Sequence, residues 1–214
     1  LVLQHDLGTS LLFFGLFLVM IYTATGRAIY TVVGLGMFIS GALVASRTID
    51  YVIKRFDAWL NPFDQSNYDA IGGSYQLVQG LFGFAHGGLL GTGLGGGVPQ
   101  LVPLAESDFI VASLGEELGL VGIFAIFTLY ILLVSRGLRV GFNHNDEFSK
   151  LLATGLSFAF ALQCFIVIGG VTRIVPLTGL TTPFLAAGGS SLVANWIIIA
   201  LLLRISDTIR KDVP

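Results

Sequence analysis

Residues 118–135 read LGLVGIFAIFTLYILLVS, a run without a single charged side chain. As a helix it would be about 27 Å long, close to the thickness of the hydrocarbon core of a bilayer. In the whole chain only 11% of residues are charged and 54% are hydrophobic, with a mean hydropathy of +0.85. Because soluble domains carry roughly 25% charged residues, the sequence predicts a membrane protein.

Uncharged stretches of similar or greater length also occupy residues 7–26, 28–46, 151–172 and 174–203. The last is too long for one span, and Pro176, Gly179 and Pro183 predict an irregular segment at about 173–187 before a helix from about Gly188. The predicted fold class is therefore all-α, a polytopic bundle with about five transmembrane helices in this chain.

A long loop at about 47–107 separates the second span from the third. Its first part is rich in charge around Trp59, as expected at a membrane interface. Residues 70–105 carry no acidic or basic side chain apart from a histidine and contain eleven glycines. A simple spanning helix is improbable with so much glycine, so we expect a short helix near residues 75–84 followed by glycine-rich turns.

The eleven basic residues divide unequally between the two sides of this bundle. Seven fall on one side and four on the other, and the positive-inside rule assigns the richer side to the cytoplasm. The C-terminus is then cytoplasmic and the long loop extracytoplasmic. The cytoplasmic set is Arg27, Arg136, Arg139, Lys150, Arg204, Arg210 and Lys211, and the outer set is Arg47, Lys54, Arg55 and Arg173.

Several function classes find no support in the sequence. A net charge of −2 without a basic arm argues against nucleic acid as a partner. The single Cys164 cannot form an internal disulfide, and three scattered histidines do not make a zinc motif. Residues 91–96 match G-x-G-x-x-G, but no predicted strand precedes them, so we interpret them as a turn.

Residues 103–119, PLAESDFIVASLGEELG, gather four carboxylates at the start of an apolar run. A helix through Asp108 and Glu116 would place both on one face, about 12 Å apart. The helix macrodipole alone accounts for Glu106 and Asp108. Glu116 and Glu117 lie deeper, where a charge costs about 2.5–3.5 kcal/mol on insertion scales. They therefore indicate either a functional pocket or a structural ion pair.

Four stretches, in order along the chain, resemble motifs of the SEDS family, the RodA/FtsW proteins that polymerise lipid II into peptidoglycan. They are QHDLGTS at 4–10, RFDAWLNPFD at 55–64 with YQLVQ at 75–79, SDFIVASLGEELG at 107–119, and PLTGLTTPFLAAGGSS at 176–191. The family has ten spans with both termini cytoplasmic. The resemblance implies that residues 1–214 are the C-terminal part of one SEDS-type membrane domain, closer to the elongation branch, RodA, than to FtsW.

The resemblance further implies an inverting peptidoglycan glycosyltransferase of the bacterial cytoplasmic membrane, acting in cell wall biogenesis and cell shape during elongation. Asp108 matches the family's proposed catalytic aspartate, and an ionised aspartate can accept a proton from the attacking hydroxyl. A leaving diphosphate needs positive charge, from basic side chains or from a divalent cation for which no ligand spacing is present. Candidates for binding substrate or diphosphate are Arg55, Lys54, Arg47, Arg173, Tyr75, Gln76, Glu116 and Asp6.

The partners implied by the resemblance are lipid II, undecaprenyl-linked glycan and a class B penicillin-binding protein with transpeptidase activity. Two alternatives remain open at this point. Broken helices with a buried acid also fit a transporter that flips lipid II across the membrane. A non-catalytic scaffold of a cell-wall synthase would need neither Asp108 nor a cavity.

Overall fold

The structure is a computed structural model that describes residues 6–70 and 72–211, without the side chains of residues 209–211. Within these residues it is built of helices and turns and contains no β-strand, so the predicted all-α class is confirmed. The elements are α1 (Leu7–Thr25), α2 (Ala28–Thr48), α3 (Asp50–Leu60), α4 (Gln65–Tyr68), α5 (Tyr75–Gly87), the 3-10 turn η1 (Pro99–Leu101), α6 (Ile110–Phe142), α7 (Glu147–Val171) and α8 (Gly189–Lys211).

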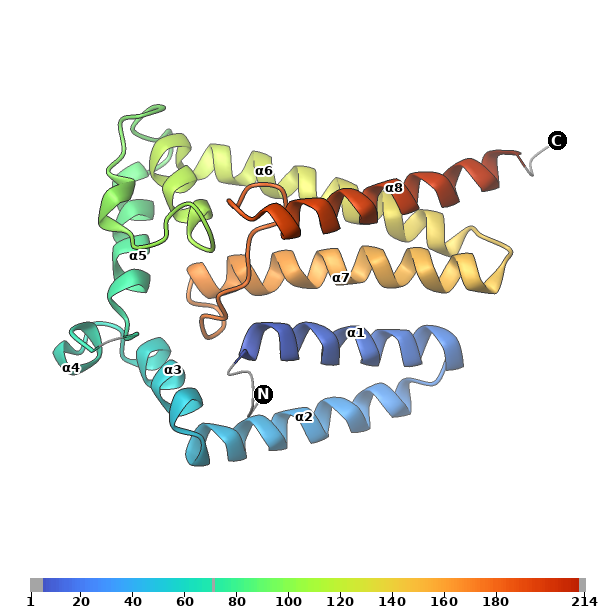
Figure 1. The fold of residues 1–214 in the computed structure, drawn as a ribbon, viewed down its shortest axis with the longest axis horizontal. Helices are drawn as coiled ribbons and strands as arrows, with labels where there is room; N and C mark the ends of the chain where they lie inside the picture. Colours follow the sequence, from blue (N-terminus) through green and yellow to red (C-terminus); the bar gives the residue numbers. More distant parts are fainter. Residues whose placement is uncertain (1–5, 71, 212–214) are drawn as a thin grey trace.

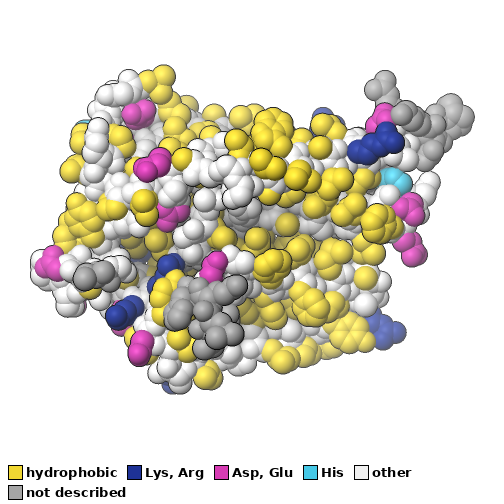
Figure 2. Space-filling view, in the orientation of Figure 1, with side chains coloured by type: hydrophobic (Ala, Val, Ile, Leu, Met, Phe, Trp, Pro, Cys, Tyr) yellow, Lys and Arg dark blue, Asp and Glu magenta, His cyan; other side chains and the backbone are white. Residues whose placement is uncertain are grey.

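Five of the helices in the described part, α1, α2, α6, α7 and α8, are long and apolar enough to cross a bilayer. Figure 1 shows them running side by side, with α3, α4 and α5 together at the left-hand end. We call this the α5 end. In Figure 2 the charged side chains lie mainly toward the two ends of the molecule, and hydrophobic side chains dominate the surface between them. The predicted multi-pass membrane architecture is confirmed.

Local sequence signals explain where the spanning helices begin and end. The carboxylate of Asp6 accepts a hydrogen bond from the Thr9 amide at 2.9 Å and caps the start of α1. α1 ends at Gly26 in the left-handed conformation, and its N–H donates to the Tyr22 carbonyl. Asp146 caps α7 in the same way as Asp6, because its side chain accepts from the Ser149 amide.

Small residues allow the spanning helices to approach one another closely. A Cβ at Gly137 or Gly141 of α6 would run into the Ser157 or Thr154 side chain of α7. Lipid chains are as apolar as the helix surfaces, so close van der Waals packing rather than a hydrophobic driving force holds such helices together. The close approach of α6 and α7 therefore depends on glycine at these two positions, because any Cβ there would push the helices apart.

α6 is broken at Gly119, whose φ of 68° and ψ of −173° are not helical. The glycine-rich loop after α5 fills the break with backbone hydrogen bonds. Thr92 and Gly93 donate to the carbonyls of Glu116 and Glu117, both at 3.0 Å. In the other direction, the amides of residues 120 and 121 donate to the carbonyls of residues 88 and 89 at 3.0 and 3.1 Å. We call this exchange the loop clamp, and it satisfies peptide groups that lipid could not.

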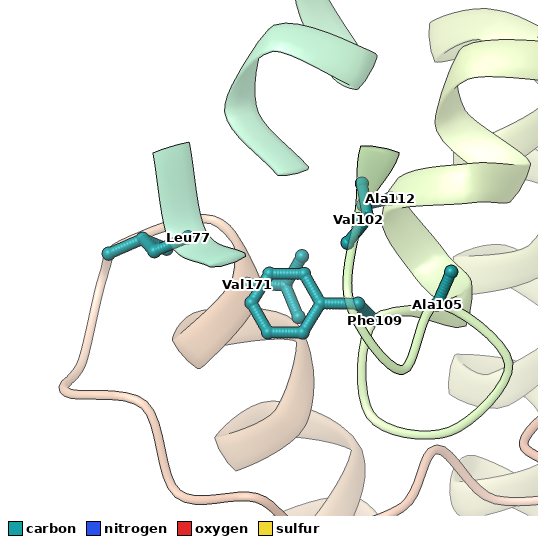
Figure 3. Close-up of a cluster of buried hydrophobic side chains, with 6 residues drawn as sticks. All are labelled: Leu77, Val102, Ala105, Phe109, Ala112 and Val171. Carbon is teal, nitrogen blue, oxygen red and sulfur yellow. The ribbon is translucent and has the colours of Figure 1, made fainter. Parts of the chain in front are cut away.

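A cluster of buried side chains joins α5, the start of α6 and the end of α7. Figure 3 shows the Phe109 ring overlapping Val171 of α7 in this view, with Leu77 of α5 to the left, and Ala112 lies one turn further along α6. Phe109 has no exposed surface. This packing fixes the position of the residue before it, Asp108, at the α5 end of the bundle.

The segment at 172–188 is irregular, as predicted from its prolines and glycine. Hydrogen bonds with several neighbouring residues hold its backbone. The Gln163 amide donates to the Thr181 carbonyl at 2.9 Å, and the Tyr130 hydroxyl donates to the Pro183 carbonyl at 2.5 Å. The Ala187 amide donates to the Glu106 carbonyl at 2.7 Å, which ties the segment to the turns before α6.

Candidate active site at the α5 end

Asp108 lies in the turns that precede α6 and is half-buried. The prediction of one helix through Asp108 and Glu116 is wrong, because α6 begins only at Ile110 and Phe109 takes the N-cap position. Asp108 Oδ1 accepts a hydrogen bond from the Ser107 hydroxyl at 2.9 Å. Its carboxylate is thus held by a turn and not by a helix face.

The irregular segment passes directly beside Asp108. Asp108 and residues 177–180 line a hollow of about 10 Å³ together with the end of α7, which is room for roughly one water molecule. On the other side of this segment lies the start of α1, where a Cβ at Gly8 would come within 2.6 Å of the Leu180 side chain. Residues 177–180 are therefore enclosed between Asp108 and α1.

A larger cavity of about 400 Å³ adjoins this hollow and shares Leu177 with it. Arg55, Tyr75 and Gln76, three of the residues singled out from the sequence, all line this cavity. Arg55 Nη1 donates to the Leu177 carbonyl, and its guanidinium lies 4.8 Å from the centre of the Tyr51 ring. The structure thus brings together residues that are far apart in the sequence.

The other walls of the cavity include residues that the sequence did not single out as binding candidates. They are Ala58, Trp59, Ala70, Gly72, Gly73, Ser74, Leu77, Pro103 and Leu177. Gln76 is held at the rim by a 2.6 Å hydrogen bond from its side-chain amide to the Pro103 carbonyl. Trp59 and Tyr75 belong to the same one of the four motif stretches, and this was the sequence signal that could have paired them here.

Asp6 lies at the start of α1 and contributes mainly to its cap. Burial raises the pKa of Asp6, but hydrogen bonds from Thr9 and Gly8 outweigh it and, with the charge of Arg55, lower that pKa below its ordinary value. The carboxylate is therefore kept ionised by its local partners. Gln4 and His5 of the same motif lie outside the described residues.

Arg173 has its charge directed at the last turn of α3. Its Nε donates to the Trp59 carbonyl at 2.9 Å and its Nη2 to the Leu60 carbonyl at 2.8 Å, while the Trp59 indole N–H donates back to the Arg173 carbonyl at 3.0 Å. Arg173 itself has a φ of 63°, which is uncommon outside glycine. These bonds give Arg173 a structural role, because a positive charge at the C-terminus of a helix stabilises that helix.

Glu116 is 5% exposed and pairs with His86 of α5, whose Nδ1 lies 2.8 Å from Oε1. Of the two sequence interpretations, the pairing supports the structural one. His86 was not predicted as the partner, because the two residues are thirty positions apart and only the packing of α5 on α6 brings them together. Glu116 also belongs to the loop clamp through its carbonyl, and a Cβ at Gly97 of the glycine-rich loop would lie 3.1 Å from the Glu116 carboxylate.

The remaining candidates, Lys54 on α3 and Arg47 at the end of α2, are exposed. No group of three His, Cys, Asp or Glu side chains that could hold a metal ion is found in the described part of the chain. The arrangement as a whole offers a carboxylate at a small hollow, and one guanidinium in an adjoining cavity with two aromatic walls. Such a pair can accept a proton at one point and bind an anionic group at another.

Residues 1–211 match the family of FtsW, RodA and SpoVE, described as "Cell cycle protein". The chain belongs to this family. It is the SEDS family, so the resemblance seen in the four motifs is confirmed. A SEDS relative from Mycobacterium tuberculosis (strain ATCC 25618 / H37Rv), named "Peptidoglycan glycosyltransferase RodA", is 53% identical over 211 residues, which are 99% of this chain and 44% of the relative.

Another SEDS relative, from Geobacter metallireducens, is named "Probable peptidoglycan glycosyltransferase FtsW". It is 34% identical over 209 residues, 97% of this chain and 55% of the relative. The chain therefore spans about half the length of the curated relatives it matches. A solved structure described as "Structural coordination of polymerization and crosslinking by a peptidoglycan synthase complex" has a chain with the same fold. It matches with a TM-score of 0.78 at 23% identity, over 99% of this chain and 58% of that one.

Proposed function

We propose that this chain is the C-terminal part of a RodA-like peptidoglycan polymerase that transfers the disaccharide of lipid II to a growing glycan strand during cell elongation. The SEDS membership and the higher identity to RodA than to FtsW support this assignment. The observation that carries the site is the shared wall at Leu177. It separates the hollow beside Asp108 from the cavity of Arg55 by a single residue.

In the proposed reaction, the 4-hydroxyl oxygen of one lipid-linked disaccharide attacks the anomeric carbon of another from the face opposite the leaving group. A new C–O bond forms, the bond between that carbon and the diphosphate oxygen breaks, and the configuration inverts. The Asp108 carboxylate takes the hydroxyl proton. Arg55 stabilises the charge that develops on the lipid diphosphate, because a guanidinium can bind phosphate oxygens with two parallel N–H donors.

The proposed orientation puts the α5 end outside the cell and the C-terminus in the cytoplasm. The excess of basic residues at the opposite end supports it. Single cysteines at Ala70 and Asn145, both exposed positions, test it in a Cys164→Ala background. An impermeant thiol reagent added to intact cells should label the cysteine at 70 alone. Labelling at 145 alone would invert the topology and remove the outer site.

The decisive experiment replaces Asp108 by Asn in the full-length protein and measures polymer formation from lipid II. Asn preserves the shape of the side chain and removes the base, so the rate should fall roughly 10²- to 10⁴-fold. Glu106→Gln is the matched control, because Glu106 lies in the same turns and its side chain is exposed. It should retain the wild-type rate.

Binding and folding should survive in the Asp108→Asn protein, because a base acts mainly in the transition state. A folded Asp108→Asn protein that polymerised lipid II at the wild-type rate would remove Asp108 from the mechanism. If the wild-type protein moved lipid II across a bilayer without forming polymer, the transporter alternative would replace the proposal. The proposed class B penicillin-binding partner is tested separately, by copurification of the two full-length proteins. Copurification should be lost when the transmembrane helices of the two proteins are exchanged.

A further inference from the structure

A second cavity lies at the end of the bundle opposite the candidate active site, between α6 and α8. Its volume is about 480 Å³. α6 contributes a stripe with helical spacing, Leu133, Gly137 and Val140, and α8 contributes another that includes Leu202 and Leu203. The floor of this groove is therefore apolar, and it lies at the end of two helices that are long and apolar enough to span a bilayer.

Two arginines, Arg136 and Arg139, line the same groove together with Asn143 and Ser206. Both arginines are exposed, and neither forms an ion pair within the described residues. The charge of Asp207, next to the groove on α8, is already opposed by Arg204 at 3.7 Å. The mouth of the groove thus carries two guanidiniums whose charge nothing in the described chain neutralises.

The position of the two arginines along α6 matches a lipid headgroup in depth. The uncharged run that ends at Ser135 would be about 27 Å long as a helix, so Arg136 and Arg139 follow where the hydrocarbon core ends. Three positions apart, they lie on one face of the helix. Arginines at such a depth commonly only orient the span in the membrane, but these two border a groove that opens between two helices.

We propose that the groove between α6 and α8 binds an anionic phospholipid, with the headgroup phosphate on Arg136 and Arg139 and the upper part of one acyl chain along the apolar floor. Guanidiniums hold phosphate through paired N–H donors, and basic pockets between spanning helices on the cytoplasmic side bind anionic headgroups in this way. Charge complementarity selects this occupant over a zwitterionic lipid, whose own ammonium group would face the same arginines.

The occupant is a lipid of the inner leaflet and not the lipid-linked sugar, because the groove and the candidate active site lie at opposite ends of the spans. This assignment rests on the proposed orientation of the protein. The test below contains no lipid II, so a failure to bind phospholipid leaves the proposed glycosyl transfer intact, and a failure of polymerisation leaves the lipid site intact.

The experiment uses the full-length protein in detergent and measures retained phosphatidylglycerol by native mass spectrometry against added phosphatidylcholine. Arg136→Gln with Arg139→Gln removes two basic groups near the phosphate and should weaken phosphatidylglycerol binding roughly 30-fold. Arg27→Gln with Lys150→Gln is the matched control. It removes the same charge from the same end of the bundle at two exposed residues outside the groove, and should change binding less than about 3-fold.

A second variant fills the groove and keeps both arginines. Leu203 is 66% exposed and lines the floor, so Leu203→Trp should weaken lipid retention at least 5-fold without a change in net charge. Equal losses in the two charge variants would mean general electrostatic attraction only, and no loss in either would mean that Arg136 and Arg139 do not hold the lipid. Either result would overturn the site. A photoreactive residue at 203 that crosslinked a polypeptide instead of phospholipid would assign the groove to a protein partner and equally refute the proposal.

Discussion

Replacement of Gly119 by alanine should release the glycine-rich loop from α6. A Cβ at this position would lie 2.6 Å from the Leu89 carbonyl oxygen and 2.6 Å from the Leu90 carbonyl carbon. These are backbone atoms, so no side-chain rotation relieves the collision. The backbone angles at Gly119 also fall in a region that is essentially limited to glycine, where other residues incur about 1–3 kcal/mol. The break in α6 and the loop clamp cannot both survive the substitution.

The most favourable response is for α6 to straighten and expel the loop. The carbonyls of Glu116 and Glu117 then regain partners within the helix, but the amides of Thr92 and Gly93 lose theirs. The carbonyls of residues 88 and 89 lose theirs as well. Two of the four hydrogen bonds of the clamp are not replaced, which destabilises the protein by about 1–3 kcal/mol. The better helix propensity of alanine offsets up to about 1 kcal/mol of this loss.

Amide hydrogen exchange of the purified full-length protein, followed on peptides that cover residues 86–97, measures the release directly. Exchange there should accelerate at least 10-fold in Gly119→Ala, a change of about 1.4 kcal/mol in local opening. Gly26→Ala is the matched control. Gly26 also has a positive φ, 67°, but nothing lies within 4 Å of its Cβ position. The control should therefore lose about 1–2 kcal/mol of stability without faster exchange in the loop.

Unchanged exchange of the loop in Gly119→Ala, together with an unfolding temperature equal to that of the wild type, would refute the clamp. Equal acceleration in Gly119→Ala and Gly26→Ala would refute it too, because the effect would then follow from general loss of stability and not from the contact between Gly119 and the loop.

Three further substitutions separate binding from structure. Arg55→Lys keeps the charge and loses the planar guanidinium, so it should raise the apparent KM for lipid II less than Arg55→Ala does. Wild-type kinetics in both variants would leave Arg55 as a structural residue that holds Leu177. Arg173→Ala removes two charge-assisted hydrogen bonds to the end of α3 and should lower the free energy of unfolding by about 1.5–3 kcal/mol. Unchanged thermal stability with weakened lipid II binding would instead assign Arg173 to substrate binding. The lowered pKa of Asp6 stabilises the fold above the ordinary carboxyl range, and this stabilisation is lost as the pH falls through that lowered pKa. Asp6→Asn should retain the cap and flatten this acid limb of the unfolding curve, and an unaltered limb would contradict the assignment.

The spans could be predicted from the sequence because the signal is local. A run such as residues 118–135 identifies itself by length and by the absence of charge, whatever it packs against. Proline and glycine likewise marked the irregular segment at 172–188, since both break helices through their own backbone geometry. The caps at Gly26 and Asp6 depend on the same kind of short-range information, but neither was predicted, and Asp6 was instead named as a binding candidate.

The motifs also indicated which side chains matter in the candidate site, but not how they are combined. Arg55 and Gln76 came from one motif and Asp108 from another, and no sequence pattern joins them at Leu177. Periodicity was misleading at Asp108 itself. A spacing of eight residues to Glu116 implies a shared helix face, but the turn anchored by the buried Phe109 delays the start of α6.

The sequence by itself determined that this protein is a helical membrane protein of the SEDS family, because hydrophobic length and short motifs are properties of the chain. Only the tertiary structure decided which residues distant in the sequence contact one another. Glu116 meets His86, Arg173 meets the end of α3, and Gly119 meets the glycine-rich loop. Each contact joins residues distant in sequence, and its energy depends on distance and burial, which arise only when the helices pack.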